Sequence, residues 1–402
     1  MFAHLHVHSP FSFCDGAGLE RELVARAAEA GLPALALTDH DGLSGAVRWH
    51  RLCRAAGIKP ILGAEATMED GSHLTLLARD RRGYANLCGL LTQAHLEHER
   101  REPRVTIPSL ARWAEGLICL SGCRRGRVRA LVRRGAGDQA EEYARRLLGL
   151  FGREGFFIEL QHDLYPGDRG DLGRLAELAE ALGVGVVATN NVHYATRNQF
   201  FVQDVLTCIR EHLGIEEPHA ARPINAERWL KGVGEMQAVF ARRPEALDNT
   251  LRVADQCEDY EIGGAEYVPR YPVPVGTSAP ELLRRLALQG ARRRYGSVPE
   301  DLRRRLNHEL AVIEQMGFVD YFLIVWDVVE FARREGIRYA GRGSCADSVV
   351  AYALGITNVD AYRRRLRFER FINPSRLNTL PDIDVDFDSR RRDDVGEYVV
   401  GR

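Results

Sequence analysis

Short apolar runs alternate with longer helical patterns along the first 200 residues. The runs lie at residues 2–8, 34–38, 60–66, 73–78, 117–121, 156–160 and 185–189. Between several of them, segments rich in Ala, Leu, Arg and Glu, such as 19–30 and 139–150, place apolar residues at helical spacing. Repeated strand-then-helix units are typical of a mostly parallel sheet covered by helices. The pattern therefore predicts an α/β domain whose seven strands form a barrel-like layer.

The pattern changes after about residue 208. Residues 209–275 have a mainly helical character and end in a stretch rich in Pro and Gly, which is typical of a domain boundary. Residues 276–402 contain two strand-like segments, at 337–339 and 381–388. We therefore expect a first domain over 1–208, a helical connecting segment over 209–275 and a second domain over 276–402.

Composition indicates a globular protein. The 402 residues include 55 Lys and Arg against 56 Asp and Glu, a net charge of −1, and 45% of them are hydrophobic. No apolar run approaches the roughly 20 residues that cross a membrane. The N-terminus has no signal-peptide pattern, and the eight cysteines show no regular spacing, which is typical of reduced cysteines. We therefore expect a cytoplasmic protein with no membrane partner.

Histidine and charge are unevenly distributed. Ten of the thirteen histidines lie in the first 193 residues, as a metal site there would require. Residues 281–402 carry 22 Arg and 19 acidic residues, net +3, whereas residues 1–280 carry 33 basic and 37 acidic residues, net −4. Arg triplets lie at 292–294, 303–305, 363–365 and 390–392. Such runs are usually solvated helix faces, so they support polyanion binding only weakly.

Side chains that bind metals recur at the predicted strands of the first domain. By the two-residue period of a strand, His4, His6 and His8 share one face of the first strand. Further candidates stand at or after later strands: Asp15, His40, Glu65, His73, Cys123 and His193. Imidazole, carboxylate and thiolate groups together suit zinc or manganese. Any one of them alone is more often a hydrogen-bonded structural residue, so their recurrence carries the prediction.

A glycine-rich turn stands out in the second domain. It reads Gly341-Arg342-Gly343-Ser344 and precedes an apolar helical segment over 349–354. Glycines let a backbone approach a phosphate closely, and helix N-terminal amides with Arg342, Ser344 and Ser348 supply donors for an anion. The alternative is a tight loop without a ligand, which such a turn alone does not exclude.

Residues 381–388 alternate strictly between polar and apolar positions. The carboxylates on one strand face are Asp382, Asp384, Asp386 and Asp388, with Ile383, Val385 and Phe387 on the core face. Carboxylates two residues apart lie only ~6.6 Å apart along a strand, so bound cations must offset their repulsion. A pair of Mg²⁺ ions can activate an attacking hydroxyl and stabilise a leaving pyrophosphate. The segment therefore predicts a Mg²⁺ site for phosphoryl transfer.

The order of motifs over residues 1–200 resembles the polymerase and histidinol phosphatase (PHP) domain. The motifs are His6-Val7-His8, Asp15-Gly16, Thr-Asp-His-Asp-Gly around His40, Gly-Ala-Glu ending at Glu65, and Asn-Asn-Val-His ending at His193. The resemblance implies a distorted barrel of seven β/α units that binds up to three metal ions for phosphoester hydrolysis. The implied ligands are His6, His8, Asp15, His40, Glu65, His73, Cys123 and His193. Asn191 stands where the family usually has Asp, and a neutral amide binds metals more weakly, which argues against full nuclease activity.

Residues 276–402 resemble the palm of the bacterial C-family DNA polymerases. The resemblance rests on Gly341–Ser344, Pro381–Phe387 and the intervening segment 368–374, and a PHP domain followed by these motifs is specific. It implies an α+β, nucleotidyltransferase-like partial palm, in which Asp382 and Asp384 are catalytic and Gly341–Ser344 with Ser348 hold nucleotide phosphates. The family's third catalytic Asp, thumb and fingers would follow Arg402, so we expect no polymerase activity from this chain alone. Asp347, usually Gly in replicative members, points weakly to the error-prone branch.

Three functions are therefore open. The first is the N-terminal portion of a DNA-directed DNA polymerase, with Mg²⁺ in the palm. Its partners would be a DNA primer-template, dNTPs and other polymerase subunits such as the sliding clamp. The second is a stand-alone PHP-type phosphoesterase or 3′–5′ exonuclease that uses Zn²⁺ or Mn²⁺. The third is a non-catalytic scaffold that binds DNA or a polymerase subunit.

Overall fold

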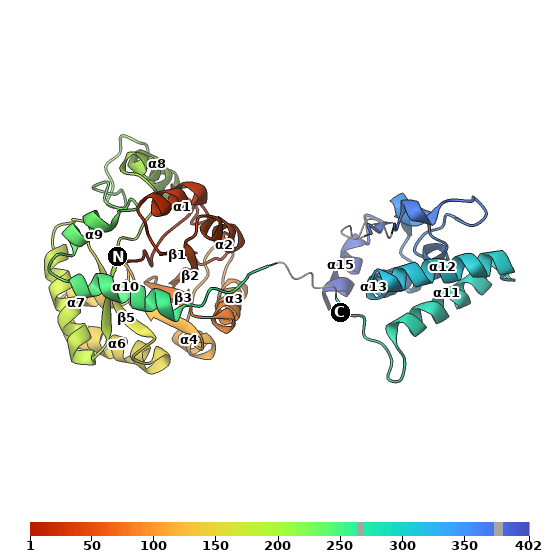
Figure 1. Cartoon of the computed structure of the whole chain (residues 1–402), viewed down its shortest axis with the longest axis horizontal. Coiled ribbons are helices and arrows are strands. Elements are labelled where there is room, and N and C mark those ends of the chain that lie inside the picture. Colours follow the sequence, from red (N-terminus) through yellow and green to blue (C-terminus); the bar gives the residue numbers. More distant parts are fainter. Residues whose placement is uncertain (264–268, 374–380, 402) are drawn as a thin grey trace. The chain divides into compact units, whose positions relative to one another are not determined.

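The computed structural model describes residues 1–263, 269–373 and 381–401 (Figure 1). The chain divides into two compact units, Met1–Gly264 and Ala265–Arg402. Among the helices in these described ranges, none combines the length and the apolar composition of a membrane span.

Six strands make the sheet of the first unit, in the same order in space as in sequence. They are β1 (Ala34–His40), β2 (Lys59–Thr67), β3 (His73–Ala78), β4 (Leu117–Leu120), β5 (Phe156–Gln161) and β6 (Gly185–Thr189). Neighbouring strands are parallel except that β3 runs antiparallel to both β2 and β4. Helices surround this sheet (Figure 1), which confirms the predicted α/β class.

The N-terminal segment lies between the two edges of the sheet instead of forming a regular strand. His4 pairs with Leu35 of β1, and Val7 pairs with Val192 just beyond β6, each as a single bridge. The N–H of Ala36 donates to the carbonyl of His4 at 2.9 Å, and the N–H of His8 donates to the carbonyl of Val192 at 2.8 Å. The segment therefore closes the sheet into a distorted barrel.

The expectation that three histidines share one face of this segment is wrong for His4. Its Nε2 lies 2.9 Å from the carbonyl oxygen of Lys231, whereas Nδ1 of His6 lies 2.7 Å from Glu159 on β5. Single bridges, unlike a continuous ladder, do not maintain the alternation of a strand. Burial lowers the pKa of His4 to about 4, so His4 is a neutral structural residue.

Apolar side chains fill both sides of the sheet. One buried cluster takes residues from all six strands and the N-terminal segment, so it fills the barrel interior: Ala3, Leu5, Ala34, Ala36, Ile61, Leu77, Ile118, Leu120, Phe157 and Val187. Val253 and Ala254 join this cluster from a later helix. A larger cluster packs the other strand face against the outer helices, and it includes Leu35, Leu62, Leu74 and Ile158. The polar side chains that face the barrel interior therefore lie beyond its apolar cluster.

Ten helices of the first unit appear in the described ranges. They are α1 (Glu20–Glu29), α2 (Ala46–Ala55), α3 (Arg81–Glu97), α4 (Ile107–Trp113), α5 (Arg127–Arg133), α6 (Gly137–Phe151), α7 (Asp168–Leu182), α8 (Phe200–Glu211), α9 (Val233–Val239) and α10 (Pro244–Gln256). The segment expected to connect two domains contributes Met236, Phe240 and Leu247 to the core of this unit.

The second unit combines helices with a two-stranded antiparallel sheet. Its elements are α11 (Ala279–Tyr295), α12 (Glu300–Gln315), α13 (Val319–Arg334), β7 (Tyr339–Arg342), η2 (Gly343–Asp347), α14 (Val349–Leu354), η3 (Phe368–Arg370), β8 (Asp384–Phe387) and α15 (Arg392–Gly401). Ile383 packs into the buried core with Leu283, Phe322 and Val350. The apolar face predicted for residues 381–388 is therefore present.

Candidate functional site

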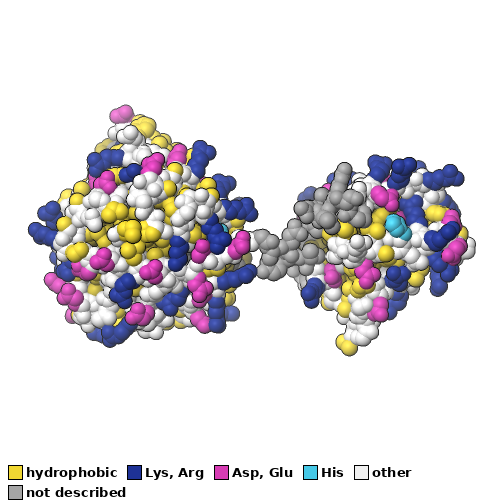
Figure 2. Space-filling model, in the orientation of Figure 1, with side chains coloured by type: hydrophobic (Ala, Val, Ile, Leu, Met, Phe, Trp, Pro, Cys, Tyr) yellow, Lys and Arg dark blue, Asp and Glu magenta, His cyan; other side chains and the backbone are white. Residues whose placement is uncertain are grey.

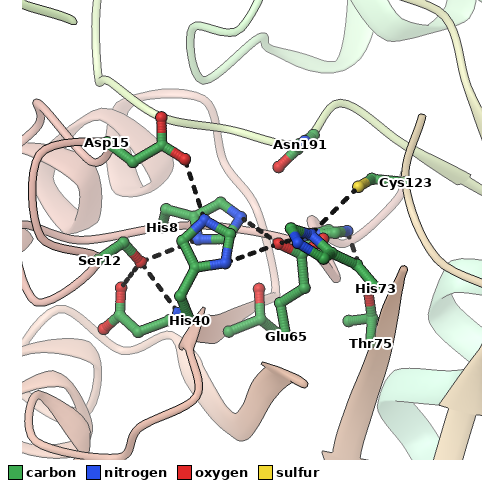
Figure 3. Close-up of polar contacts among 12 residues, drawn as sticks. His8, Ser12, Asp15, His40, Glu65, His73, Thr75, Cys123 and Asn191 are labelled. Carbon is green, nitrogen blue, oxygen red and sulfur yellow. Dashed lines mark hydrogen bonds and ion pairs between the residues drawn. The ribbon is translucent and has the colours of Figure 1, made fainter. Parts of the chain in front are cut away.

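Two groups of potential metal ligands meet at Glu65 on β2. His6, His8 and Glu65 form one group, and His40, Glu65 and His73 form the other, with the ligand atoms of each group within 4.8 Å of one another. Oε1 of Glu65 lies 3.2 Å from Nε2 of His6, and Oε2 lies 2.9 Å from Nδ1 of His40 and 2.8 Å from Nδ1 of His73. Figure 3 shows the side chains of His40 and His73 close to Glu65. One carboxylate shared by imidazoles is a suitable bridge between two cations.

Buried acids orient the rings of His6 and His8. Glu159 lies 2.7 Å from Nδ1 of His6. Nδ1 of His8 lies 2.9 Å from the hydroxyl of Ser12, which donates to Asp39 at 2.7 Å (Figure 3). Because the Ser12 proton is given to Asp39, Nδ1 of His8 is the donor of the pair. In both rings this leaves Nε2 for a ligand, as in metal sites whose histidines donate their other nitrogen to a carboxylate.

Several polar atoms facing this cluster have no hydrogen-bond partner. They are Nε2 of His6, Nε2 of His8, Oε1 of Glu65 and Oδ1 of Asn191, all in buried residues. His6 and Glu65 are close but are not aligned as a hydrogen bond. An unsatisfied buried polar atom costs about 1–3 kcal/mol, and a bound cation would satisfy several of these at once. The residues present therefore fit a metal centre.

The remaining predicted ligands lie at the edge of the same cluster. Oδ2 of Asp15 is 2.9 Å from Nε2 of His40 and 3.2 Å from Nε2 of His193. Sγ of Cys123 lies 3.8 Å from Nδ1 of His73 (Figure 3). All eight ligands predicted for this domain thus belong to one connected set. Arg210 on α8 also reaches it, because its Nη1 lies 3.0 Å from Oδ1 of Asp15.

Charge in the cluster is balanced by protons on the rings. Burial alone would lower the pKa of His6, but Glu159 and Glu65 raise it to about 10. Burial would likewise lower the pKa of His40, but Glu65 and Asp15 raise it to about 10. The pKa of His8 falls well below its usual value because of burial and the neighbouring His40 and His193. His6 and His40 therefore hold protons that a bound cation must displace.

Metal binding should release at least two protons per chain at pH 7. His6 and His40, with a pKa of about 10 each, are protonated at that pH and must lose a proton to coordinate a cation. Affinity for Mn²⁺ should therefore rise with pH between 6 and 9. Titration calorimetry in two buffers of different ionisation enthalpy measures the number of protons directly. A binding heat that is the same in both buffers would contradict this prediction.

Glu159 and Asp39 orient ligands but were not among the predicted site residues. Glu159 is buried and accepts hydrogen bonds from Thr189 at 2.6 Å and Thr75 at 3.3 Å. A signal for it exists in the sequence, because it is the only acid inside the apolar run 156–160. A carboxylate in a fully buried strand needs a partner of its own.

The second site lies where β7 meets β8. Arg342 pairs in register with Asp384, and its guanidinium lies 3.1 Å from Oδ2 of Asp384 and 3.1 Å from Oδ1 of Asp386. Asp382 is exposed and lines a pocket of about 210 Å³ together with Ser344 and Arg370. The structure thus brings both predicted catalytic carboxylates beside the glycine-rich turn.

Gly341 and Gly343 of this turn are explained by different features of the structure. A Cβ at Gly341 would lie 2.3 Å from the carbonyl oxygen of Ile356, so the two backbones pack too closely for any side chain. Gly343 has φ +73°, and a Cβ there would lie 3.4 Å from Oδ2 of Asp384. Gly341 is therefore required by packing, whereas Gly343 lets the turn pass beside a predicted catalytic carboxylate.

Gly341→Ala should destabilise the second unit by about 1–3 kcal/mol, since the added methyl group overpacks the contact with Ile356. Gly396→Ala in α15 is the matched control, because no atom lies within 4 Å of its Cβ. We expect the control to be neutral or slightly stabilising. Hydrogen exchange of the β7 amides measures both effects, and equal exchange in the two variants would refute the packing role.

Ser348 does not occupy the position expected of a phosphate donor. It is buried, its hydroxyl donates to Glu309 at 2.8 Å, and it accepts from the N–H of Ala351 at 3.0 Å. Glu309 also accepts from the N–H of Val350 at 3.0 Å. Ser348 is an N-cap of α14 whose hydroxyl is used internally. From the sequence alone, a serine that caps a helix cannot be distinguished from a serine that donates to a bound phosphate.

Comparison with known proteins matches each unit to a different family model. The sequence profile described as "PHP domain" matches residues 4–163, and the profile described as "Bacterial DNA polymerase III alpha NTPase domain" matches residues 281–402. The error-prone DNA polymerase of Symbiobacterium thermophilum is 49% identical over 415 aligned positions, which cover 99% of this chain and 38% of that protein. The chain therefore combines a match to the PHP domain with a match to the bacterial DNA polymerase III alpha NTPase domain.

The chain is similar both to error-prone DNA polymerases and to DNA polymerase III alpha subunits. The DNA polymerase III subunit alpha of Treponema pallidum is 40% identical over 417 aligned positions, covering 100% of this chain and 36% of that protein. The chain thus spans little more than a third of the length of these relatives. Among solved structures, an amidohydrolase from Chromobacterium violaceum aligns at 16% identity with a TM-score of 0.34, covering 48% of this chain and 88% of that one.

Proposed function

We propose that this chain is the N-terminal part of a DNA-directed DNA polymerase that adds dNTPs to a primer-template. The observation that carries the proposal is the placement of Asp382 and Asp384 beside the turn at Gly343 and Ser344, in a chain that matches the polymerase III alpha domain. A bacterial polymerase of this kind acts in the cytoplasm. The proposed domain limits are 1–208, 209–275 and 276–402, with residues 209–263 of the connecting segment packed into the first compact unit. The sliding clamp remains a proposed partner of the whole enzyme.

Asp382 and Asp384 are the proposed ligands for Mg²⁺. Bound Mg²⁺ would supply charge for nucleotidyl transfer. Arg342 already neutralises part of the charge on Asp384 and Asp386, so it keeps the strand face together without a cation. The same guanidinium can turn towards a nucleotide phosphate when a cation takes over the carboxylate.

A chimera tests the proposal. This chain would replace the matching 38% of the Symbiobacterium thermophilum polymerase, to which it is 49% identical. Primer extension with Mg²⁺ and dNTPs at a rate close to that of the parent is the expected result. A chimera that folds and binds primer-template but adds no nucleotide would refute the proposal.

A second candidate function is metal-dependent phosphoester hydrolysis in the first unit. The eight connected ligands, with unpartnered atoms on His6, His8 and Glu65, favour it. Zn²⁺ and Mn²⁺ are the proposed cations because the ligands are imidazoles, carboxylates and a thiol. Burial and Glu65 hold the pKa of the Cys123 thiol well above its usual value, so a cation must displace its proton as well.

Asn191→Asp should raise Mn²⁺-dependent hydrolysis of a thymidine p-nitrophenyl phosphodiester by at least about 10-fold. The side chain is buried, and its Oδ1 has no partner, so a carboxylate there adds a charged ligand where an amide stands now. Asn198→Asp, at an exposed position in the following turn, is the control and should change nothing. If Asn191→Asp binds no more Mn²⁺ and hydrolyses no faster, position 191 does not limit the site.

A further inference from the structure

Two of the four Arg triplets form one surface on the second unit. The hydroxyl of Tyr295, at the end of α11, donates to Oδ1 of Asp360 at 2.7 Å. Arg294 donates to Oδ1 of Asn358 at 3.4 Å, and the guanidinium of Arg363 lies 5.8 Å from the centre of the Tyr295 ring. We call this surface the arginine–tyrosine patch. It consists of the arginines at 292–294 and 363–365 with Tyr295 and Tyr352.

Tyrosine rings hold two of these arginines by their flat faces. The guanidinium of Arg294 lies 4.2 Å from the centre of the Tyr352 ring. The rings of Tyr295 and Tyr352 are themselves in contact, with centres 5.6 Å apart. Stacking occupies the face of a guanidinium but leaves N–H groups at its edge. The rings thus restrict the arginine side chains while leaving donors for an anion.

Most of the positive charge in the patch is not neutralised by the protein. Arg292, Arg293, Arg364 and Arg365 are exposed, and none forms an ion pair with another described residue. Asp360 is engaged by Tyr295 and lies 3.5 Å from Arg363. Figure 2 shows arginine side chains, in dark blue, projecting from the surface of this unit. Exposed positive charge that the protein leaves without a partner favours a bound polyanion.

The other two triplets are used differently. Arg305 pairs with Glu309 at 3.0 Å and donates to the carbonyls of Ala361 and Asp347, so it is a structural residue. Arg391 pairs with Asp394, and Arg392 lies 3.7 Å from Asp393. Each of these two triplets keeps one arginine without an ion pair among the described residues, Arg304 or Arg390, whereas each triplet of the patch keeps at least two.

We propose that the arginine–tyrosine patch binds the phosphodiester backbone of DNA at a place separate from Asp382 and Asp384. The inference rests on the proposed function, which supplies DNA as the polyanion. Arginine suits phosphate because its planar fork donates two hydrogen bonds to one phosphate group. Contacts of this kind read no base sequence, so the patch increases affinity and orients the strand without selecting a sequence.

DNA binding by the whole chain tests the proposal through fluorescence anisotropy with labelled single-stranded and duplex 20-mers. The patch variant combines Arg293→Ser, Arg364→Ser and Arg365→Ser. The matched control combines Arg51→Ser, Arg134→Ser and Arg146→Ser, which remove the same charge from exposed positions of the first unit. We expect the patch variant to bind at least 10-fold more weakly at 50 mM salt, and the control to stay within about 2-fold of the original chain.

The salt dependence gives a second readout. Each lost phosphate contact should reduce the slope of log K against log salt by about 0.9 on duplex DNA or 0.7 on a single strand. The form of DNA, single-stranded or duplex, whose salt slope changes more between the unaltered chain and the patch variant is the ligand of the patch. Equal weakening by both variants, or no binding by the unaltered chain, would overturn the proposal. Primer extension by the chimera without the patch substitutions is measured separately, so failure of the patch and failure of the proposed function are distinguished.

Discussion

Asp384→Asn should lower the rate of primer extension about 10³-fold in the chimeric polymerase described above. A carboxylate ligand of Mg²⁺ contributes several kcal/mol to the transition state of phosphoryl transfer, and an amide cannot replace its charge. The structure suits this role, because Asp384 lies on β8 directly beside Gly343 of the glycine-rich turn. Single-turnover extension measures the effect without product release.

Asp388→Asn is the matched control for this variant. Asp388 lies on the same segment but beyond the end of β8, and its backbone N–H donates to the carbonyl of Arg338 at 2.9 Å. Extension by the control should stay within a few-fold of the unaltered chimera. If Asp384→Asn extends primers as fast as this control, Asp384 is not a catalytic ligand.

Glu65→Gln should remove metal binding from both groups of the first unit and lower affinity for Mn²⁺ by more than about 100-fold. Glu65 is the one residue that both groups share, and it is buried. In the metal-free protein, its pKa lies well below the usual value: burial opposes this, but His73, His40 and His6 outweigh burial. Removing this charge leaves buried imidazolium rings without their partner, which costs about 3–5 kcal/mol of stability.

Glu69→Gln, four residues later and exposed, is the control for Glu65→Gln. Thermal unfolding with and without Mn²⁺ separates the two expected effects. The original chain and the control should both gain stability from Mn²⁺, whereas Glu65→Gln should start lower and gain nothing. A Glu65→Gln variant that Mn²⁺ stabilises as strongly as the control would show that Glu65 is not a ligand.

The structure brings the predicted ligands of the first site together because they lie at one edge of the sheet. His40, Glu65 and His73 each lie at or near the end of a strand, and the sheet brings such positions together. The prediction failed for His4, since the segment at 2–8 forms single bridges and its side chains do not alternate regularly. The periodicity of a segment does not show whether the segment forms continuous hydrogen-bonded ladders with its neighbouring strands.

Orienting residues were harder to predict because their partners are distant in sequence. Glu159 contacts His6 across 153 positions, and nothing in the neighbourhood of either residue specifies this contact. Ser348 failed for a related reason: its partner Glu309 lies on α12, and only the packed structure shows that the hydroxyl is buried and already used. Alternation on one strand, by contrast, was sufficient to place Ile383 on the core face.

The metal content of the first unit tests the central claim most directly. Native mass spectrometry of the whole chain, loaded with Mn²⁺ or Zn²⁺ and freed of excess ion, counts the cations bound. The account predicts at least two per chain, and fewer than one in Glu65→Gln, since both groups share that carboxylate. A chain that retains no cation under these conditions, or a Glu65→Gln variant that retains as many as the original, would contradict it.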